Sequence, residues 1–330
     1  MLKVRVGQRG ASVVGPGIHV ALDHSGPASA LRFLSHAHSD HISDLRTGQR
    51  VICSEPTEIL AALRGKFFTK VQLDSASLVP TGHMLGSAAF HIPGEFLYTG
   101  DFNDRDREFS EGFRPPRARV MITEATYGME KFVFDRERDV ISEAADEISG
   151  LLKRDKCVII TGYPLGKSQH LQMMLDQYFD GVASYCWPSI EVYNDIYRLF
   201  GKRISSKREI SAGVEAELLD EGSPKLVYLP SYAKRLSLYE ELRRRGAVSF
   251  GFSGWSMLED YTETVGVDQA FPISDHADFN GLIRTVERVG PEKVYVTHGF
   301  TKELTKALRE RGIDASPLSG ARGRLSFFLD

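Results

Sequence analysis

The chain has 330 residues, a formal net charge of −3 and a pI near 6.4, and 42% of its residues are hydrophobic. These values are typical of a soluble globular protein with one large domain or two ordinary ones. No run approaches the roughly 20 consecutive apolar residues that cross a bilayer, and the N-terminal MLKVRVGQRG lacks the apolar core of a signal peptide, so we expect a cytoplasmic protein without a membrane partner. The charge excludes an overall basic surface, so any basic surface must be local.

The first third of the chain has the pattern of short strands and turns. Three apolar stretches there, IHVALD (18–23), ALRFLSH (30–36) and FLYTGD (96–101), each end in polar residues. This is expected when strands deliver side chains to a site at one edge of a sheet. Functional residues should therefore follow these strands.

The middle of the chain alternates between helix and strand patterns. Apolar residues recur at helical spacing over 136–156, the strand-like CVIITG follows, and a second amphipathic segment covers 168–178. The strand-like KLVYLP and AVSFGFSG flank another helix near 236–245. Residues of about 130–257 are therefore predicted to form a compact α/β unit. The last part has the strand-like VYVTHGF, a helix, and the terminal RLSFFLD.

The three cysteines, Cys53, Cys157 and Cys186, stand apart in the sequence and are odd in number. This pattern favours reduced, buried thiols over a disulfide framework or a thiolate metal site. Any metal ligands should therefore be sought among histidines and carboxylates.

Four potential metal ligands fall within six residues in the segment HAHSDH, which begins at His36 and directly follows the apolar LRFL. A lone histidine is usually structural, but such a density of ligands is rare outside metal sites. Nitrogen and carboxylate ligands without cysteine favour zinc first, with manganese or iron as alternatives. Because positions 36 and 38 can point one way while 40 and 41 turn another, this one loop could serve two adjacent ions.

The pattern His-x-His-x-Asp-His resembles the signature of the metallo-β-lactamase superfamily. The resemblance implies an α/β fold, an αββα sandwich, and assigns three further residues. His83 in TGHMLGSAAF would complete the first metal site, Asp101 in YTGDFNDR would bridge two ions, and Asp23 would orient the ligands from behind. Taken singly, His83 and Asp101 are also compatible with ordinary turn residues.

Glu124 in ITEATYG, His276 in ISDHADF and His298 in VTHGF resemble the additional motifs of the β-CASP nucleases, the branch that cuts RNA or DNA phosphodiesters. That branch carries a second domain inserted into the first. The resemblance therefore covers essentially the whole chain, with residues 1–129 and 258–330 as the metallo-β-lactamase domain and 130–257 as the β-CASP domain. Glu124 could instead be a buried acid paired with a base.

The resemblance implies two divalent ions, zinc or else manganese, that supply a bridging hydroxide for attack on phosphorus. Seven residues are the expected ligands: His36, His38 and His83 for one ion, Asp40, His41 and His298 for the other, and Asp101 between them. Asp40 and Asp101 thereby belong to the catalytic set as well. His276 would protonate the departing 3′ oxygen, and Glu124 would hold that imidazole in position.

Two segments of the predicted insert are assigned to substrate binding. TGYPLGKSQH contains Gly-Lys-Ser but lacks the spacing of a phosphate-binding Walker loop. It resembles instead the β-CASP segment Gly-Arg-x-Gln-Glu, with Lys167 keeping the charge and His170 replacing the acid. Ser253 and Gly254 in GFSGWS resemble a turn whose backbone N–H groups approach a substrate phosphate, although Ser-Gly is also common in ordinary turns.

These assignments predict a metal-dependent nuclease that acts on ends or flaps of single-stranded RNA or DNA. RNA is favoured because His298 matches RNA-processing members, and a DNA exonuclease of repair is the alternative. Two other functions stay open: a hydrolase of small esters or thioesters, against which Glu124 and His276 argue, and a non-catalytic partner in a processing complex, against which the full ligand set argues. A homodimer or a processing or repair complex is expected, while exonuclease and endonuclease action are not separated.

Overall fold

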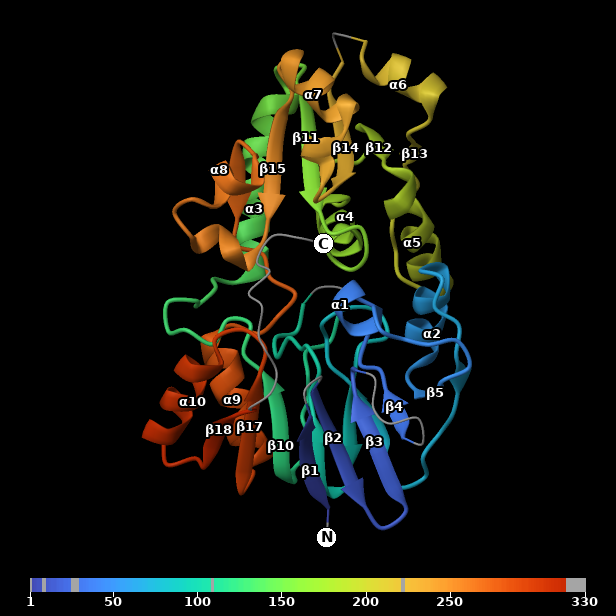
Figure 1. The fold of residues 1–330 in the computed structure, drawn as a ribbon. Helices are drawn as coiled ribbons and strands as arrows, with labels where there is room; N and C mark the ends of the chain where they lie inside the picture. The colour runs from blue at the N-terminus through green and yellow to red at the C-terminus, as the bar shows by residue number, and fades with distance from the viewer. Residues whose placement is uncertain (1, 8–9, 25–29, 108–109, 221–222, 319–330) are drawn as a thin grey trace. The chain divides into compact units, whose positions relative to one another are not determined.

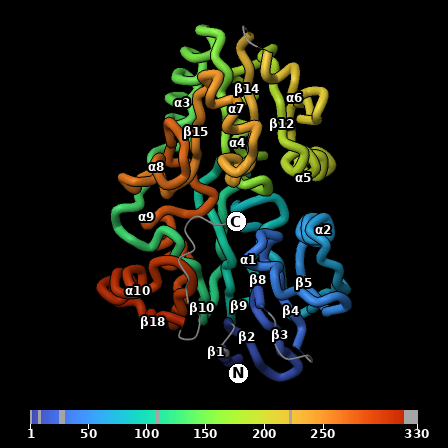
Figure 2. The backbone as a smooth tube through the Cα atoms, turned by 45° about the horizontal axis from the view of Figure 1, so that its top comes forward, coloured from blue at the N-terminus to red at the C-terminus, as the bar shows by residue number. Residues whose placement is uncertain are grey.

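The computed structural model describes residues 2–7, 10–24, 30–107, 110–220 and 223–318. Contacts between Cα atoms divide these residues into two compact units, the first formed by 2–133 with 275–318 and the second by 134–274. The first unit therefore contains both the earliest and the latest described segments, drawn in blue and in red (Figures 1 and 2). Each unit is described by itself.

The first unit contains two six-stranded sheets. The strands of the first sheet, in spatial order, are β1 (Lys3–Gly7), β2 (Gly10–Gly15), β3 (Ile18–Leu22), β4 (Leu31–Phe33), β5 (Arg50–Ile52) and β6 (Thr69–Lys70). The strands of the second sheet, in spatial order, are β18 (Ala315–Pro317), β17 (Lys293–Thr297), β10 (Ala118–Glu124), β9 (Gly94–Tyr98), β8 (Ala88–Ile92) and β7 (Ser77–Pro80). Strands β3 and β4 are parallel, as are β9, β10 and β17.

The two sheets of the first unit pack face to face around a shared core. Phe33 and Ile52 from the first sheet lie in one buried cluster with Phe90, Phe96 and Ile122 from the second. A second buried cluster joins the opposite face of the second sheet to two helices, α9 (Phe279–Val289) and α10 (Thr301–Glu310). These helices lie beside β17 and β18 (Figure 1). Two shorter helices, α1 (Ser39–Ile42) and α2 (Glu55–Leu63), follow β4 and β5 in the chain.

The second unit is a parallel α/β structure. Its sheet contains, in spatial order, β13 (Arg208–Glu209), β12 (Ala183–Cys186), β14 (Lys225–Pro230), β11 (Cys157–Gly162), β15 (Val248–Phe252) and β16 (Gln269–Phe271), and every neighbouring pair is parallel. Its helical segments are α3 (Glu137–Leu152), α4 (Lys167–Leu175), α5 (Pro188–Leu199), α6 (Ala212–Leu218), η1 (Ala233–Arg235), α7 (Ser237–Arg244), η2 (Gly254–Met257) and α8 (Tyr261–Val265). Parallel sheets of this kind bury both faces under their crossover helices.

The predicted α/β fold with two sheets in one unit and an inserted α/β unit is confirmed. The contact boundaries fall at 133/134 and 274/275, whereas the sequence suggested 129/130 and 257/258. The later second boundary has a physical reason, because β16 pairs with β15 and thereby belongs to the second sheet system. The terminal RLSFFLD lies outside the described residues.

The helix and strand predictions for the middle of the chain hold, with α3, β11, α4, β14, α7 and β15 in the expected places. All three cysteines are free, as predicted, and Cys53 and Cys186 are buried. Burial raises the pKa of the Cys53 thiol to about 12, which keeps it protonated and unreactive. Among the described residues, no helix combines the length and apolar character needed to span a bilayer.

Candidate metal centre and its supporting groups

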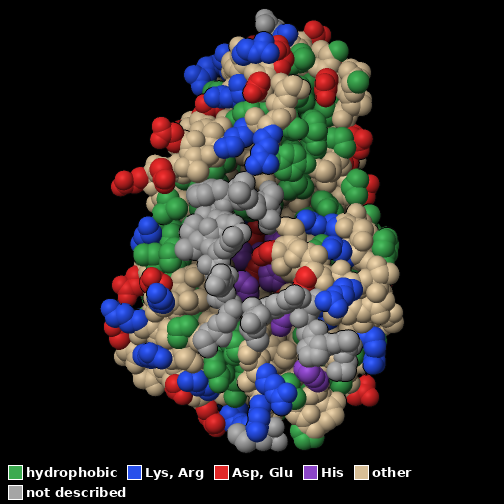
Figure 3. All heavy atoms as spheres, in the orientation of Figure 1, with side chains coloured by type: hydrophobic (Ala, Val, Ile, Leu, Met, Phe, Trp, Pro, Cys, Tyr) green, Lys and Arg blue, Asp and Glu red, His purple; other side chains and the backbone are tan. Residues whose placement is uncertain are grey.

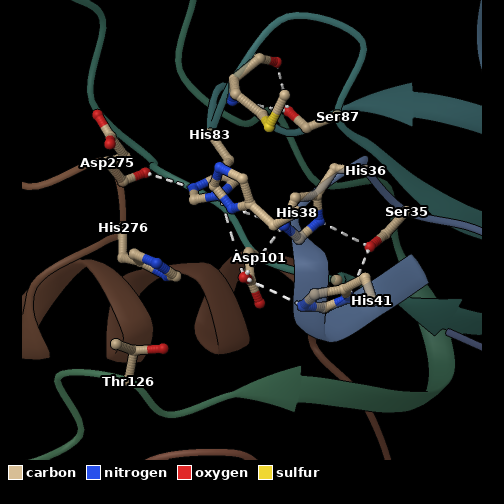
Figure 4. A network of polar contacts seen from close by, with 12 residues as sticks. Ser35, His36, His38, His41, His83, Ser87, Asp101, Thr126, Asp275 and His276 are labelled. Carbon is tan, nitrogen blue, oxygen red and sulfur yellow. Dashed lines mark hydrogen bonds and ion pairs between the residues drawn. The ribbon is translucent and has the colours of Figure 1, made fainter. Parts of the chain in front are cut away.

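The polar residues that follow the parallel strands of the first unit converge at one edge. Asp23 follows β3, the segment from Ser35 follows β4, Asp101 follows β9 and Glu124 closes β10. Ligands in α/β folds commonly bind at the carboxyl ends of parallel strands. The predicted strand-end site is therefore where the first unit gathers its titratable side chains, as Figure 4 shows.

Three imidazoles form the first group of candidate ligands. Nδ1 of His38 lies 3.1 Å from Nε2 of His36 and 3.2 Å from Nε2 of His83 (Figure 4). Nitrogens that bind one tetrahedral zinc at 2.0–2.1 Å lie roughly 3.3 Å apart, so this spacing fits a single zinc ion. All three residues were predicted for the first metal, and their ligand atoms lie within 4.8 Å of one another.

The second group surrounds Asp101. Its Oδ2 atom lies 3.6 Å from Nε2 of His36, 3.5 Å from Nε2 of His41 and 4.0 Å from Nε2 of His83. The predicted bridging carboxylate thus reaches both the first group and His41. Asp40 lies on the solvent side, with Oδ2 3.4 Å from Nε2 of His41 and 59% of its side chain exposed.

His298, the remaining predicted ligand, occupies a different kind of position. It is exposed and its ring centroid lies 6.0 Å from that of His41, in a stacked arrangement. It does not join the described groups in which His, Cys, Asp or Glu ligand atoms lie within 4.8 Å of one another. Its backbone has φ +56°, a left-handed conformation that non-glycine residues rarely adopt away from functional sites. The structure therefore brings His298 beside His41 but not to ligand spacing.

A buried network orients His41 and His36 from behind. Asp23 Oδ2 accepts hydrogen bonds from Nδ1 of His41 at 2.9 Å, the hydroxyl of Tyr98 at 2.9 Å and the hydroxyl of Ser35 at 2.5 Å. The Ser35 hydroxyl oxygen in turn lies 3.0 Å from Nδ1 of His36 (Figure 4). With Nδ1 engaged, the Nε2 atoms of both rings are left to face Asp101, the arrangement that fixes ligand histidines in known metal sites.

The electrostatics of the site favour bound cations. Burial lowers the pKa of His36 and His83 well below the usual histidine range, so both rings are neutral at pH 7 and offer a lone pair. Burial alone would also lower the pKa of His41, but the carboxylates of Asp40, Asp23 and Asp101 raise it well above its usual value. A place that stabilises an imidazolium this strongly also stabilises a metal ion.

His276 and Glu124 form an acid–base pair, and His276 also lies in a group with His83 and Asp101 whose ligand atoms are within 4.8 Å of one another. Nδ1 of His276 lies 2.9 Å from each carboxylate oxygen of Glu124, and the ring centroid of His276 lies 4.6 Å from that of His83. Glu124 is fixed in turn by the backbone N–H groups of Phe102, at 2.8 Å, and Thr126, at 3.3 Å. Burial opposes protonation of His276, yet the Glu124 carboxylate raises its pKa to about 9. Glu124 therefore orients the His276 ring and favours its protonated form.

Arg107 is a supporting residue that the sequence did not reveal. Its side chain is buried, and Nη2 donates to the carbonyl oxygens of Gly82 and, at 3.2 Å, His83, while Nη1 lies 3.2 Å from Oδ1 of Asp275. The carbonyl oxygen of Asp275 accepts from Nδ1 of His83 at 3.1 Å. Arg107 thereby ties the turn that carries His83 to the loop that carries His276.

Arg107→Ala is expected to lower the melting temperature and weaken zinc binding, because removing one partner of the buried Arg107–Asp275 ion pair costs about 3–5 kcal/mol. The matched control is Arg114→Ala, which breaks an ion pair with Asp106 whose side chains are 57% and 65% exposed. That exposed pair should contribute only about 0–1 kcal/mol. Equal melting temperatures for the two variants would show that Arg107 does not support the site.

Gly299, next to His298, is expected to tolerate no side chain. It has φ +63°, and a Cβ atom there would lie 2.2 Å from the carbonyl oxygen of Ala125. Gly299→Ala should lower the free energy of unfolding by at least about 2 kcal/mol in a urea titration, from the left-handed conformation and the overlap together. Gly312→Ala is the control, since Gly312 has φ +78° but nothing within 4 Å of a Cβ atom. The same loss in both variants would mean that the overlap relaxes freely.

The three residues predicted for substrate binding belong to the second unit. Lys167 is buried at the first position of α4, and its ammonium donates to the carbonyl oxygen of Ile273 at 2.7 Å. Ser253 caps η2, where its hydroxyl accepts from the N–H of Trp255 at 3.2 Å, and Gly254 is buried behind it. His170, also of α4, donates from Nε2 to Glu137 of α3 at 2.8 Å.

The chain resembles known proteins along most of its length. Residues 269–316 match the family described as Zn-dependent metallo-hydrolase RNA specificity domain, a segment that contains His276 and His298. A probable DNA ligase of Opitutus terrae is 32% identical over 300 residues, 86% of this chain and 28% of that protein. The cleavage and polyadenylation specificity factor subunit 3 of Dictyostelium discoideum is 24% identical over 276 residues, 68% of this chain and 35% of that protein.

Shorter matches and a solved structure agree with these relatives. The endoribonuclease ysh-1 of Neurospora crassa is 34% identical over 112 residues, 32% of this chain and 13% of that protein. The crystal structure of a protein of unknown function from Enterococcus faecalis V583 has a TM-score of 0.57 and 15% identity, covering 91% of this chain and 82% of that one, and shows the fold alone. The chain spans about a third or less of the length of the curated relatives described here.

Proposed function

The chain belongs to the β-CASP nuclease family of the metallo-β-lactamase superfamily, and we propose that it hydrolyses phosphodiester bonds of single-stranded nucleic acid. The observation that carries this proposal is the pair of His276 and Glu124 at the edge of the metal-ligand groups. Hydrolysis of a phosphodiester requires neutralisation of the phosphate charge and a proton for the departing oxygen. The candidate ligands would hold the cations, and His276, held by Glu124, would supply the proton.

We propose that two divalent ions, zinc in the first place, are held by the seven predicted ligands. When bound, such ions activate water and neutralise phosphate charge. His36, His38 and His83 would hold the first ion through nitrogens that already lie 3.1–3.2 Å apart. Asp101 would reach both ions, because its Oδ2 faces His36 and His41.

The second ion would draw on Asp40, His41 and His298. Asp23 holds His41 with Nε2 directed to the site, and the exposed Asp40 can approach it from the solvent side. His298 would need to move from its stacked position beside His41 to bind. We therefore propose that the second ion is bound more weakly than the first, which has three histidines at ligand spacing.

His276 would protonate the departing 3′ oxygen. Its Nδ1 donates to Glu124, so Nε2 is the atom that can reach a substrate, and Glu124 keeps the ring both oriented and charged. Glu124 itself cannot turn away, because Phe102 N–H and Thr126 N–H hold its two oxygens. Small-ester hydrolysis would not require this additional acid, which favours the nuclease over that alternative.

DNA is a second candidate substrate beside the predicted RNA. The endoribonuclease relatives and the family description name RNA, which agrees with the prediction from His298. The relative that aligns with 86% of this chain is named a probable DNA ligase, and this favours DNA ends as the substrate. The Dictyostelium relative is named as a subunit, which supports the further proposal that this chain works within a processing or repair complex.

Matched single-stranded RNA and DNA of one sequence, labelled at the 5′ end, separate these substrates. The metal-loaded chain should cleave at least one of them, with the preferred sugar identified by the ratio of kcat/KM values. Loss of one nucleotide at a time would indicate an exonuclease, and internal products an endonuclease. Absence of cleavage of both strands with metal bound would favour the small-ester or non-catalytic alternatives.

A further inference from the structure

The turn after α2 exposes a large aromatic side chain. Phe67 is 62% exposed, and Leu63 at the end of α2 is 46% exposed. Gly65, at φ +72°, ends the helix in the left-handed conformation. No other part of the described unit covers most of the Phe67 ring. Exposed aromatic rings commonly stack on unpaired bases.

The same segment is basic although the whole chain is acidic. Between positions 46 and 70 the sequence has five basic and two acidic residues, in a chain with a net charge of −3. One acidic residue, Glu58, is already paired with Lys70 at 2.7 Å. The guanidinium groups of Arg46, Arg50 and Arg64 make no ion pair with any residue in the described part of the chain. Their charge is therefore available to an anionic partner.

This basic segment lies next to the helix that carries the candidate metal ligands. Lys66 Nζ donates to the carbonyl oxygen of Ser43 at 2.8 Å, and Ser43 follows α1 two residues after His41. Arg50 is registered with Thr69 across the β5–β6 pair, which places it close to the Phe67 turn. Figure 3 shows Lys and Arg side chains on the surface around α1 and α2, near the histidines.

We propose that Phe67, with Arg46, Arg50 and Arg64, forms a binding platform for the single-stranded nucleic acid whose phosphodiester is cut at the metal centre. The inference rests on the proposed function and names the path of the strand, which crosses α1 from the metal ligands to the α2 turn. One base stacks on the Phe67 ring, and the flanking phosphates lie against the three arginines. The positive charge of the segment and its continuity with α1 favour a polyanion over a protein as the occupant.

Binding is measured by fluorescence anisotropy in an Asp101→Ala background, so that no strand is cut. The probes are fluorescein-labelled oligothymidylate and oligouridylate of 20 nucleotides. Phe67→Ala should weaken binding of the preferred probe about 5- to 150-fold, because stacking on one aromatic ring contributes that much per base, and Phe67→Trp should retain it. Tyr178→Ala, which removes a 42% exposed aromatic from the second unit, is the matched control and should leave binding unchanged.

The salt dependence tests the arginines separately. Replacing Arg46, Arg50 and Arg64 together by Gln should reduce the slope of log K against log salt by about 2, since each phosphate contact on a single strand contributes about 0.7. Unchanged affinity in Phe67→Ala, or an unchanged slope in the triple variant, would overturn the platform and leave the patch as a protein-docking surface. Binding is measured without cleavage. A native chain that binds the probe but does not cut it would therefore refute the nuclease proposal and leave the binding platform intact.

Discussion

His276→Ala is expected to lower kcat by about 10²- to 10⁴-fold while bound metal stays unchanged, since general acids contribute that much and His276 lies outside the first three-histidine group. Its Nδ1 is held by both oxygens of Glu124, so Nε2 is the atom that faces the site, and the metal content of the variant decides whether that atom serves proton transfer or a metal. Turnover of a labelled oligonucleotide and metal content by elemental analysis are measured on the same preparation. The kcat of Glu124→Gln should lie between the kcat values of the native chain and of His276→Ala, because the amide keeps an acceptor oxygen but not the charge.

The control is His170→Ala in the second unit. His170 is also a buried histidine paired with a glutamate, Glu137, at 2.8 Å, so its loss should cost a similar amount of folding free energy. It lies outside the proposed acid–base pair, so kcat should persist, while any change in KM would reflect the substrate-binding segment that contains His170. Loss of metal in parallel with activity in His276→Ala would show that His276 is a metal ligand. His276 lies close enough to His83 and Asp101 for that role.

Asp101→Asn is expected to lower turnover by at least about 10³-fold and to release one of two bound metals. The substitution preserves size but removes the charge from an Oδ2 atom that lies 3.5–4.0 Å from the Nε2 atoms of His36, His41 and His83. Preorganised electrostatic stabilisation is usually the largest single contribution to catalysis. Metal stoichiometry after gel filtration and turnover at saturating substrate measure the two effects.

Asp106→Asn makes the same chemical change five residues later. Asp106 is 65% exposed and pairs with Arg114, so its replacement should leave both metal content and turnover at native values. If Asp101→Asn kept two metals and native turnover, the proposed bridging role would be wrong. If both variants lost metal, the loss would reflect a general effect of the removed negative charge and not the loss of a metal ligand.

The sequence predicts the centre of the site well because ligand chemistry and strand ends coincide there. His36, His38, His41, His83 and Asp101 all follow apolar strands or a glycine turn, and the fold brings them to one edge. The pair of Glu124 and His276 was predicted by resemblance, and the structure places the two side chains 2.9 Å apart. Spacing along the chain cannot give such a distance across 152 residues.

Other features depend on the folded backbone and leave little trace in sequence patterns. Arg107 supports His83 through carbonyl oxygens, and carbonyl oxygens are present at every residue. His298 has a left-handed backbone and lies 6.0 Å from the His41 ring, and Gly299 after it lies against Ala125, positions that the residue pattern does not reveal. The later domain boundary follows from the pairing of β16 with β15. A strand of three residues is too short to be predicted from the sequence pattern.

The most direct test of the two-metal nuclease is a zinc titration of the stripped chain. Metal is removed with a chelator, its absence is verified by elemental analysis, and cleavage of 5′-labelled single-stranded RNA and DNA is followed as zinc is added. We expect no cleavage at zero zinc and a rise to a plateau at two zinc ions per chain. Cleavage that persists without metal, or a chain that binds two zinc ions and cuts neither strand, would contradict it.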